Sequence, residues 1–514
     1  MTKLTETTLA LLLCLPLLHG AAGCGGCETR LVGDAGAEEA IGDPDADDGT
    51  IEPDVEEPGE DPEAPHDSPA DEPPPDGDDE AGPDLEPDGE IPAAETWVLT
   101  IGDGNRDGAV AVATAADGGI LVAGSYYAHG AGSVLWIGKL GLDGSVLWQR
   151  LIGGRGDGYY EPFSMTQTPA GDIVLAGRVN LFGDQLFDMW IVRLDASGAV
   201  LWQKSIGGTD HEAALDAVVT GDGGIIVCGR TASFSLGYDD VWVVGMDGSG
   251  AVLWQEAMGG EGYDDAYAVT RTSGGEIVVV AETNSTASGN PDLWLIFFDE
   301  SGALLRQEAL GGGEYDFGYD VLQSRDGGLV IAGSTLSFGE GFYDLWLVKT
   351  DVLGSILWQE TLGGGDSDGA ASIVELEDGT LLVAGGAQSF GRGEADAWIL
   401  RLDAAGGVIS QITLGSEGSD GAAAVSEGPD GSIVIAGQTN GLGEGAMDIL
   451  AARLTAEGDL GGCSLLADSG VTPRPSSAAA RDTDAEVRPT DAVAVDTPAE
   501  VLDFDDSPLF HCPE

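Results

Sequence analysis

Residues 343–364 read YDLWLVKTDVLGSILWQETLGG, and residues 238–260 carry nearly the same text, YDDVWVVGMDGSGAVLWQEAMGG. In both copies a tryptophan lies inside an apolar run, and a Leu-Trp-Gln segment follows a short turn that contains glycine. Text that recurs along one chain indicates a repeat architecture, in which each copy is one structural unit. The spacing and the number of the copies therefore decide the fold.

Two ladders of tryptophan positions set the period of the repeat. The first ladder is Trp136, Trp190, Trp242, Trp294, Trp346, Trp398 and Leu450, with one spacing of 54 residues followed by spacings of 52. The second ladder is Trp97, Trp148, Trp202, Trp254, Arg306, Trp358 and Ser410. Because all 11 tryptophans belong to these ladders, we interpret them as packing residues between repeated sheets and not as a local sugar-binding platform.

Each unit divides into four strands. Residues 368–414, for example, contain four apolar or alternating runs separated by turns rich in Gly and Asp, which is the pattern of short antiparallel strands. Four such strands in a unit of this length are typical of a β-propeller blade, and each ladder has seven rungs. The sequence therefore predicts an all-β fold, a seven-bladed β-propeller of four-stranded antiparallel blades over residues 96–462. A β-solenoid is the alternative, although its coils are usually much shorter.

The order of the strands predicts how the ring closes. Residues 96–102 have the pattern of a fourth strand but precede any first strand, and the last repeat ends after its third strand near Leu460. We therefore expect residues 96–102 to complete the last blade, which would remove two exposed sheet edges. The first strands of several repeats are rich in Gly and Ala, as at 108–109, 213–214 and 421–424, and such small side chains suit a crowded central channel.

The repeat resembles two groups of known propellers. Residues 194–208, LDASGAVLWQKSIGG, are similar to the Asp-x-x-Gly-x-x-x-Trp element of quinoprotein-type propellers. The wider DGG…AG…D-x-W…W-Q unit resembles the repeats of secreted bacterial β-propeller lipoproteins, over residues 96–460. The resemblance implies the fold, since such rings host unrelated activities. Quinoprotein enzymes typically have eight blades, and many have a disulfide between adjacent cysteines; this sequence has seven repeats and no adjacent cysteines, so no quinone cofactor is expected.

The N-terminus has the pattern of an export signal. Lys3 precedes the apolar run 9–18, which suits a signal peptide and is too short for an ordinary transmembrane helix. The residues Ala22-Gly23-Cys24 resemble a bacterial lipobox, with Ala21 where leucine is usual. This resemblance implies that residues 1–23 are a lipoprotein-type signal peptide and that Cys24 carries the lipid; simple secretion is the alternative. We accordingly expect an exported protein at the cell envelope, held at the outer membrane or cell surface.

Acidic segments flank the repeats. Residues 31–95 contain 26 Asp or Glu and 12 Pro, with no Lys, Arg or aromatic residue, so residues 24–95 are predicted to be a disordered linker. Residues 463–514 are also acidic and lack strand patterning, which predicts a disordered tail. Cys463 and Cys512 flank this tail and could pair in an oxidising compartment, whereas Cys228 lies in an apolar run and is predicted to be a core residue.

The charge of the chain limits its partners. The formal net charge is −70, from 90 acidic and 20 basic residues, which argues against a nucleic-acid partner because phosphate binding needs a basic surface. We expect contact with the membrane only through the lipid anchor. The expected partner is an envelope protein or a polysaccharide, whose identity the sequence does not define.

Two motifs resemble known catalytic or metal-binding motifs. Residues 365–369, GDSDG, match the G-x-S-x-G motif of a nucleophile elbow. That motif needs a helix after the serine, whereas the residues that follow here have the pattern of a strand, so we interpret the match as chance. Asp103, Asn105 and Asp107 resemble the start of a calcium loop, although Thr114 stands where the bidentate Glu should be. An Asp-capped turn is the alternative, and calcium is the one cofactor that the sequence brings into consideration. No catalytic residue is predicted.

Acidic residues recur at two positions of the repeat. One set precedes the first strand and consists of Asp107, Glu212, Asp264, Asp316, Asp368 and Asp420, with Gly158 as the exception. The other set precedes the third strand and consists of Asp188, Asp240, Asp292, Asp344, Asp396 and Asp448. Since they occur in nearly every repeat, we expect these carboxylates to accept backbone N–H bonds and fix the loops.

The longer loops indicate the working face. In a four-stranded meander the second-to-third loops and the blade-to-blade loops share one face, and both are longer here than the remaining turns. Beside the recurring acid lies a position that varies: Arg106, Asp157, His211, Tyr263, Tyr315, Ser367 and Ser419. With Tyr159, Tyr160, Tyr126, Tyr127 and His129, these residues are candidates for a ligand-binding face; neutral drift of exposed loops is the alternative.

The sequence thus favours a non-enzymatic binding or scaffolding role, as envelope lipoproteins with related rings have. One rival is an extracellular propeller enzyme, a lyase or hydrolase acting on polysaccharide, for which His211, Tyr263 and Tyr315 are the available set. The other rival is a structural ring stabilised by calcium.

Overall fold

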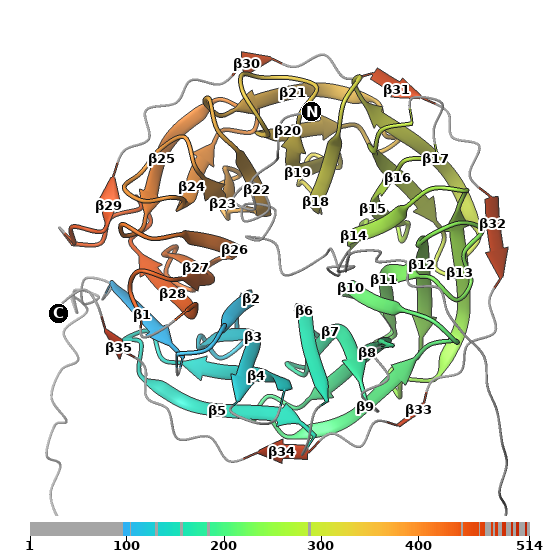
Figure 1. Cartoon of the computed structure of the whole chain (residues 1–514), viewed down its shortest axis with the longest axis horizontal. Coiled ribbons are helices and arrows are strands. Elements are labelled where there is room, and N and C mark those ends of the chain that lie inside the picture. Colours follow the sequence, from blue (N-terminus) through green and yellow to red (C-terminus); the bar gives the residue numbers. More distant parts are fainter. Residues whose placement is uncertain are drawn as a thin grey trace, which may run out of the picture. The chain divides into compact units, whose positions relative to one another are not determined.

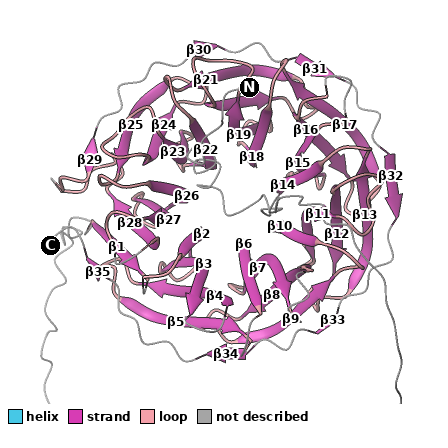
Figure 2. Ribbon diagram, viewed as in Figure 1, coloured by secondary structure: helices cyan, strands magenta, loops and turns pink. Residues whose placement is uncertain are grey.

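The computed structural model describes residues 96–461, apart from 103, 129–131, 155–157, 182–185, 286–288 and 444–445, together with residues 463–467 and six short strands beyond them. Within this part of the chain, seven β-sheets surround a central axis (Figure 1) and no helix is present (Figure 2). This confirms the predicted seven-bladed β-propeller. The signal peptide, Cys24 and the linker 24–95 lie outside the described residues.

Each blade is an antiparallel meander whose first strand lies nearest the axis and whose fourth strand lies toward the rim (Figure 1). Blade 1 consists of β2 (Gly108–Thr114), β3 (Ile120–Ala128), β4 (Gly132–Leu140) and β5 (Val146–Gly153). Blade 2 consists of β6 (Tyr159–Gln167), β7 (Ile173–Asn180), β8 (Asp188–Leu194) and β9 (Val200–Ile206). Blade 3 consists of β10 (Glu212–Val219), β11 (Ile225–Thr231), β12 (Asp240–Met246) and β13 (Val252–Gly259).

The remaining blades follow the same order. Blade 4 consists of β14 (Asp264–Arg271), β15 (Ile277–Thr283), β16 (Asp292–Phe298) and β17 (Leu304–Gly311). Blade 5 consists of β18 (Asp316–Gln323), β19 (Leu329–Thr335), β20 (Asp344–Thr350) and β21 (Ile356–Leu362). Blade 6 consists of β22 (Asp368–Glu375), β23 (Leu381–Ala387), β24 (Asp396–Leu402) and β25 (Val408–Leu414). Blade 7 consists of β26 (Asp420–Glu427), β27 (Ile433–Thr439), β28 (Asp448–Leu454) and β1 (Trp97–Ile101).

Blade 7 joins the two ends of the repeat region. Strand β1 pairs antiparallel with β28, with Trp97 opposite Arg453 and Ile101 opposite Ile449. All five residues of β1 are buried. The closure predicted for residues 96–102 is therefore confirmed, and the sheet edge that β28 would otherwise expose is covered.

The first tryptophan ladder lies in the seams between blades. Its six tryptophans are at most 1% exposed. Trp190 of blade 2, for example, belongs to one apolar cluster with Leu135 and Ile137 of blade 1. The predicted packing role of this ladder is confirmed, and so is the core position of Cys228, which is buried as a free thiol.

Members of the second ladder join rim strands to a turn of the next blade. The indole Nε1 of Trp254 donates to the backbone carbonyl of Glu300 at 3.0 Å, and that of Trp202 donates to Gly248 at 3.2 Å. Gly198 shows why such turns need glycine, because its φ is +80° and a Cβ there would lie 2.8 Å from the Trp148 ring. The Asp-x-x-Gly-x-x-x-Trp element is therefore a device for joining blades.

The tail contributes strands that we did not predict. Short segments pair antiparallel with the rim strand of every blade, namely β29 (Leu466–Ala467), β30 (Arg474–Pro475), β31 (Ala479–Arg481), β32 (Glu486–Pro489), β33 (Val495–Asp496), β34 (Glu500–Leu502) and β35 (Leu509–Phe510). They lie at the rim of the ring, coloured red in Figure 1. For these segments the expectation of a tail without strands is corrected. Pairings of two to four residues leave no alternating pattern in the sequence to detect.

Candidate functional site

The two sets of long loops share one face of the ring, as predicted. The backbone N–H of Asp264, which begins blade 4, donates to the carbonyl of Asp239 in the second-to-third loop of blade 3 at 2.8 Å. Asp368 and Tyr343 make the same contact between blades 6 and 5 at 2.7 Å. We call this side the long-loop face. The opposite face carries tight turns such as 115–119, where the N–H of Ala115 donates to Gly119 O at 2.8 Å.

The recurring acids fix these loops. Oδ2 of Asp368 accepts the N–H of Gly364 at 2.8 Å, and its Oδ1 accepts the N–H groups of Gln388 at 3.0 Å and Ser389 at 3.1 Å. The second set acts alike, since Oδ2 of Asp344 accepts the N–H of Glu340 at 2.7 Å. The predicted structural role of both sets is confirmed. The carboxylates of Asp368 and Asp344 are buried beneath the loops whose backbone N–H groups they accept.

The register of blade 2 differs from the one predicted. Tyr160 pairs with Val179, and Val179 pairs with Asp188. In blade 3, Glu212 pairs with Thr231 and Thr231 with Asp240. Tyr160, and not Gly158, is therefore the counterpart of the recurring acid, because the loop before blade 2 carries the two extra residues of the 54-residue spacing.

This register corrects the set of candidate face residues. Tyr159 takes the variable position in blade 2 that we assigned to Asp157, which lies outside the described residues together with His129. Tyr160 is 3% exposed and packs edge-on against Trp190, with ring centroids 5.4 Å apart. Tyr160 is thus a core residue and cannot contact a ligand at the surface.

Five of the remaining candidates are exposed on the long-loop face. Tyr126 and Ser367 are instead buried, at 4% and 6% exposed, which corrects their assignment to this face, and Tyr127 and Ser419 are half-buried. Tyr159, Tyr263 and Tyr315 are 39%, 46% and 40% exposed, and Arg106 and His211 are exposed as well. Single exposed hydrophobic residues are ordinary, but exposed apolar side chains that gather on one face can mark a binding surface. The variable position thus presents side chains of distinct chemistry from blades 1 to 5.

Aromatic rings run across blades 2 to 5 of this face. Phe187, in the second-to-third loop of blade 2, lies 6.1 Å from Tyr159 and is stacked on His211, also at 6.1 Å between ring centroids. Tyr238 and Tyr263 stack at 4.4 Å with an interplanar angle of 14°, and Tyr238 is 59% exposed. We define the aromatic arc as these residues together, namely Tyr159, Phe187, His211, Tyr238, Tyr263 and Tyr315. Phe187 and Tyr238 were not predicted as face residues, because no aromatic residue recurs at their positions in every repeat.

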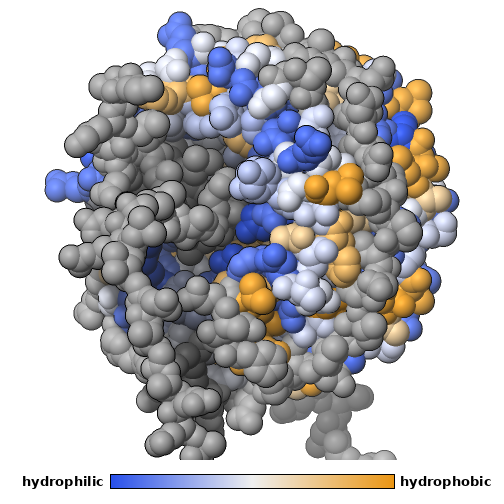
Figure 3. Space-filling model, turned by 45° about the vertical axis from the view of Figure 1, so that its right-hand side comes forward, coloured by the Kyte–Doolittle hydropathy of each residue, from blue (hydrophilic) through white to orange (hydrophobic). Residues whose placement is uncertain are grey.

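Hydrophobic side chains are also exposed elsewhere. Figure 3 shows them as separate orange patches among hydrophilic residues. One group occupies a single repeat position on the rim strands and consists of Leu147, Leu201, Leu253, Leu305, Leu357 and Ile409, which are 46–66% exposed. These six residues, the rim leucine set, offer a comparison for the aromatic arc.

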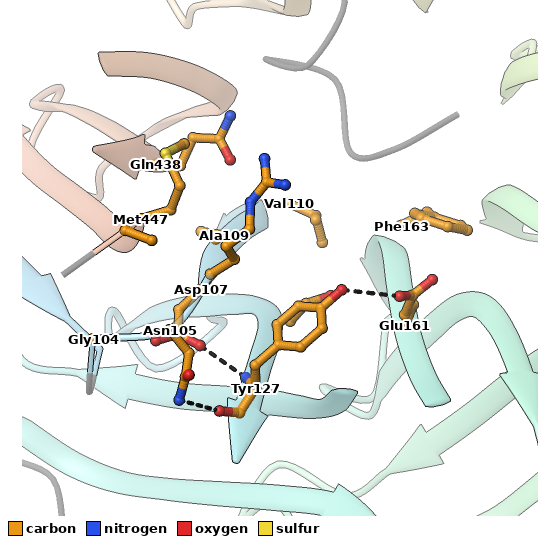
Figure 4. A pocket seen from close by; sticks show the side chains of 14 residues that line it. Gly104, Asn105, Asp107, Ala109, Val110, Tyr127, Glu161, Phe163, Gln438 and Met447 are labelled. Atoms are coloured by element: carbon orange, nitrogen blue, oxygen red, sulfur yellow. Dashed lines mark hydrogen bonds between the residues drawn. The ribbon is translucent and has the colours of Figure 1, made fainter. Parts of the chain in front are cut away.

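The residues of the possible calcium loop contact neighbouring backbone. The amide nitrogen of Asn105 donates to Tyr127 O at 2.9 Å, and Oδ1 of Asp107 accepts the N–H of Tyr127 at 2.8 Å (Figure 4). Asp103 lies outside the described residues. Among the residues that the structure does describe, no group of three His, Cys, Asp or Glu is arranged to hold a metal ion.

A cavity of about 530 Å³ lies on the same side, between blades 7, 1 and 2. Its lining includes Arg106, Tyr127, Glu161, Phe163, Gln438 and Met447. The Tyr127 hydroxyl donates to Glu161 Oε1 at 3.3 Å (Figure 4). Burial and the Glu161 carboxylate raise the pKa of Tyr127 to about 12, so this hydroxyl keeps its proton.

Charged pairs continue from the cavity around the channel. Arg178 forms an ion pair with Glu161 within blade 2, at 2.7 Å between guanidinium nitrogen and carboxylate oxygen. Arg230 of blade 3 forms one with Asp265 of blade 4 at 3.2 Å. Glu282 stands opposite Asp265 in the sheet. Burial and the Asp265 carboxylate raise the pKa of Glu282 to about 8. Sequence analysis missed these residues because strand pairing, not spacing along the chain, brings them together.

Deeper in the channel, one residue of each first strand interrupts the strand pairing. In blades 2 to 5 this residue is large, namely Phe163, Leu215, Tyr267 or Tyr319, whereas blades 6, 7 and 1 have Ala371, Ala423 and Val110. These side chains line a second cavity of about 220 Å³ together with Asp216 and Asp320. The expectation of small channel residues therefore holds for part of the ring, and aromatic rings narrow the rest.

Comparisons with known proteins give only remote structural likenesses. No sequence family and no curated protein matches the chain. Among solved structures, a protein of unknown function from Dyadobacter fermentans is 14% identical with a TM-score of 0.42, covering 70% of this chain and 98% of its own. An α-L-arabinofuranosidase from Fusarium graminearum is 11% identical with a TM-score of 0.39, covering 57% and 91%. Pseudomonas fluorescens PhoX is 11% identical with a TM-score of 0.33, covering 70% and 90%.

The seven sheets and their strand order define the class of the protein as a seven-bladed β-propeller. Among the residues described, none forms a helix able to span a membrane. Cys463 is disulfide-bonded, while Cys512 lies outside the described residues, so their pairing stays a prediction.

Proposed function

We propose that this propeller is a non-enzymatic binding protein of the bacterial cell envelope that holds a polysaccharide on its long-loop face. Lipidation at Cys24 would anchor the chain, and the acidic linker would separate the ring from the membrane. The observation that carries the proposal is the aromatic arc, which places exposed rings on four successive blades of one face.

An extended sugar chain suits this arrangement. A sugar ring has an apolar C–H face and a polar edge, and an aromatic ring offers an apolar surface against which that face can pack. Rings repeated from blade to blade would contact successive sugar units, each contact weak by itself and the series stronger through multivalency. A folded protein partner would need a broad apolar core in its interface, whereas the arc is a line of rings broken by polar loops.

The test is retention of the polysaccharide fraction of a cell-envelope extract on the immobilised full chain. The variant carries Ala at Tyr159, His211, Tyr263 and Tyr315. The matched control carries Ala at Leu201, Leu253, Leu305 and Leu357 of the rim leucine set, which removes an equal number of exposed side chains from another surface. We expect the wild type and the control to retain polysaccharide and the arc variant to lose most of it.

Two results would contradict the proposal. Equal retention by the arc variant would show that another surface binds the polysaccharide. Absence of retention by the wild type, combined with capture of an envelope protein that the arc variant loses, would assign the face to a protein partner.

A polysaccharide lyase or hydrolase is the second candidate, and one observation favours it. Glu282 is 4% exposed and lies opposite Asp265, and burial and the Asp265 carboxylate raise its pKa to about 8, which favours the protonated form that a general acid needs. Incubating the retained polysaccharide with the wild type and with Glu282→Gln would test this. Release of new reducing ends by the wild type alone would replace the binding role by an enzymatic one.

A further inference from the structure

We propose that the cavity between blades 7, 1 and 2 binds a carboxylated sugar, a uronate, and that Arg106 holds its carboxylate. This inference rests on the proposed function and narrows it to acidic polysaccharides. The cavity of about 530 Å³ has the size of a small-molecule site. It opens beside the aromatic arc, since Arg106 occupies in blade 1 the repeat position that Tyr159 occupies in blade 2.

Arg106 is the cationic group that the cavity has to offer a ligand. Within the described part of the chain, its guanidinium has neither an ion pair nor a hydrogen bond. Nine other Lys or Arg residues each hold a carboxylate, namely Lys139, Arg178, Arg193, Arg230, Arg271, Arg306, Lys349, Arg401 and Arg453. Arg150, Arg325 and Arg392 have no carboxylate partner either, but each donates to a backbone carbonyl. The planar fork of N–H donors on Arg106 matches a carboxylate.

The acidic side chains of the cavity are engaged by other groups. Glu161 accepts from Arg178 at 2.7 Å and from the Tyr127 hydroxyl at 3.3 Å. Asp107 is 1% exposed and accepts the N–H of Tyr127 at 2.8 Å. A ligand anion would therefore meet Arg106, while the Glu161 carboxylate is already paired with Arg178 and the Asp107 carboxylate is buried.

The rest of the lining suits a sugar ring. Phe163, Val110 and Met447 provide apolar surface, and Ser125 provides a hydroxyl. Figure 4 shows the labelled side chains from blades 7, 1 and 2 around the same space. A uronate ring could thus place its C–H face on the apolar side chains and its carboxylate toward Arg106.

A glycine keeps the space open. Gly108 occupies the repeat position that carries Glu161 in blade 2, Asp265 in blade 4 and Phe317 in blade 5, and a Cβ at Gly108 would lie 3.2 Å from Gln438 Oε1. Because Phe317 is accommodated at this position, a phenylalanine is compatible with the strand. Gly108→Phe would therefore fill the cavity while leaving the blade able to fold.

The experiment measures binding of glucuronate, galacturonate, glucose and galactose to the full chain by isothermal titration calorimetry. We expect both uronates to bind at least about tenfold more tightly than the neutral sugars, because a hydrogen-bonded charge pair is worth about tenfold or more. Arg106→Gln should reduce uronate affinity by about tenfold or more, and Ser419→Ala, at the same repeat position in blade 7, should leave it unchanged. Gly108→Phe should abolish binding, and Gly369→Phe, the equivalent position in blade 6, should not.

Equal affinity for uronates and neutral sugars, no uronate binding, or unchanged affinity in Arg106→Gln would overturn the inference. The polysaccharide-retention assay separates this failure from failure of the proposed function. If the arc variant loses polysaccharide while Arg106→Gln retains it, the arc binds the polymer and the proposed uronate site is wrong. If the wild type retains no polysaccharide, the result contradicts both the proposed function and the inference that rests on it.

Discussion

The carboxylate of Asp216 in blade 3 accepts a hydrogen bond from the backbone N–H of Val269 in blade 4 at 2.8 Å. Asp320 makes the same bond to Ile373 between blades 5 and 6, also at 2.8 Å. Both acids line the channel. Burial raises the pKa of Asp216 to about 7 and that of Asp320 to about 6. Two inner seams of the ring are therefore closed by groups that titrate close to neutral pH.

The Asp216 seam should make stability depend on pH in a defined direction. Its folded pKa is raised from 3.8 to about 7, so between these values the folded state binds more protons than the unfolded state, and stability falls as pH rises. Asp216→Asn keeps a carbonyl acceptor for Val269 and removes the titration. Urea unfolding over this pH window should show a smaller loss of stability in the variant, by on the order of 4 kcal/mol at about 1.4 kcal/mol per pKa unit. Exposed Asp366→Asn is the control, and parallel profiles for wild type and Asp216→Asn would refute the role of the seam.

The closing strand should be required for a stable ring. Deleting residues 93–102 removes β1, including Trp97, which is 3% exposed and donates to Leu142 O at 3.0 Å. The free edge of β28 would then be open to pairing with other chains. We expect a lower melting temperature and aggregation, measured by circular dichroism and light scattering. A deletion of equal length within the linker is the control, and an unchanged melting curve for the 93–102 deletion would contradict the closure.

Tryptophan, which occupies most positions of the second ladder, should be able to replace Arg306. Its guanidinium lies 3.7 Å from the centroid of the Phe297 ring and donates to Val352 O at 2.7 Å, and the corresponding indoles donate to the next blade in the same way. Arg306→Trp should retain most of the stability. Arg306→Ala should lose on the order of 1–2 kcal/mol, since it removes both the ring contact and the donor. Denaturant unfolding of the two variants measures the difference, and equal losses would show that the inter-blade donor is unimportant.

Chelation of calcium should leave the ring unchanged. Asn105 and Asp107 each form a hydrogen bond to the backbone of Tyr127. Melting temperatures with added calcium and with excess chelator are therefore expected to agree. A drop on chelation that calcium reverses would support the rival reading of a calcium-stabilised ring.

Removing the tail should affect association more than folding. Each blade has four strands without it, and the ring closes through β1 and β28. Truncation after Cys463 should keep the circular dichroism of the ring and expose the rim strands to pairing between molecules. Light scattering at increasing concentration would detect this, with Cys463→Ser in the full chain as the comparison. A truncated chain that is unfolded would show instead that the tail is part of the folding unit.

Features that repeat in the sequence could be predicted, and features set by strand register could not. The ladders from Trp136 to Leu450 gave the number of blades, and the early strand at 96–102 gave the closure. The two-residue insertion before blade 2 shifted Tyr160 into the core, because register follows strand pairing and not residue count. Arg178 and Glu161, or Asp265 and Glu282, lie together only once their strands pair. The aromatic arc was found in part, through the variable position that contains Tyr263 and Tyr315.

The tail meets the blades in the order 6, 5, 4, 3, 2, 1 and 7, opposite to the order in which the chain makes them. Its last contact is with β1, the strand that closes the ring. All seven short pairings can coexist only if the circumference of the ring matches the length of chain between them. The tail would therefore select for a ring of seven blades. In a ring with one blade more or fewer, the short tail segments could not all pair with their rim strands. Because the tail follows blade 7 in the chain, its segments can pair in this way only after the last blade has been made and the ring has closed.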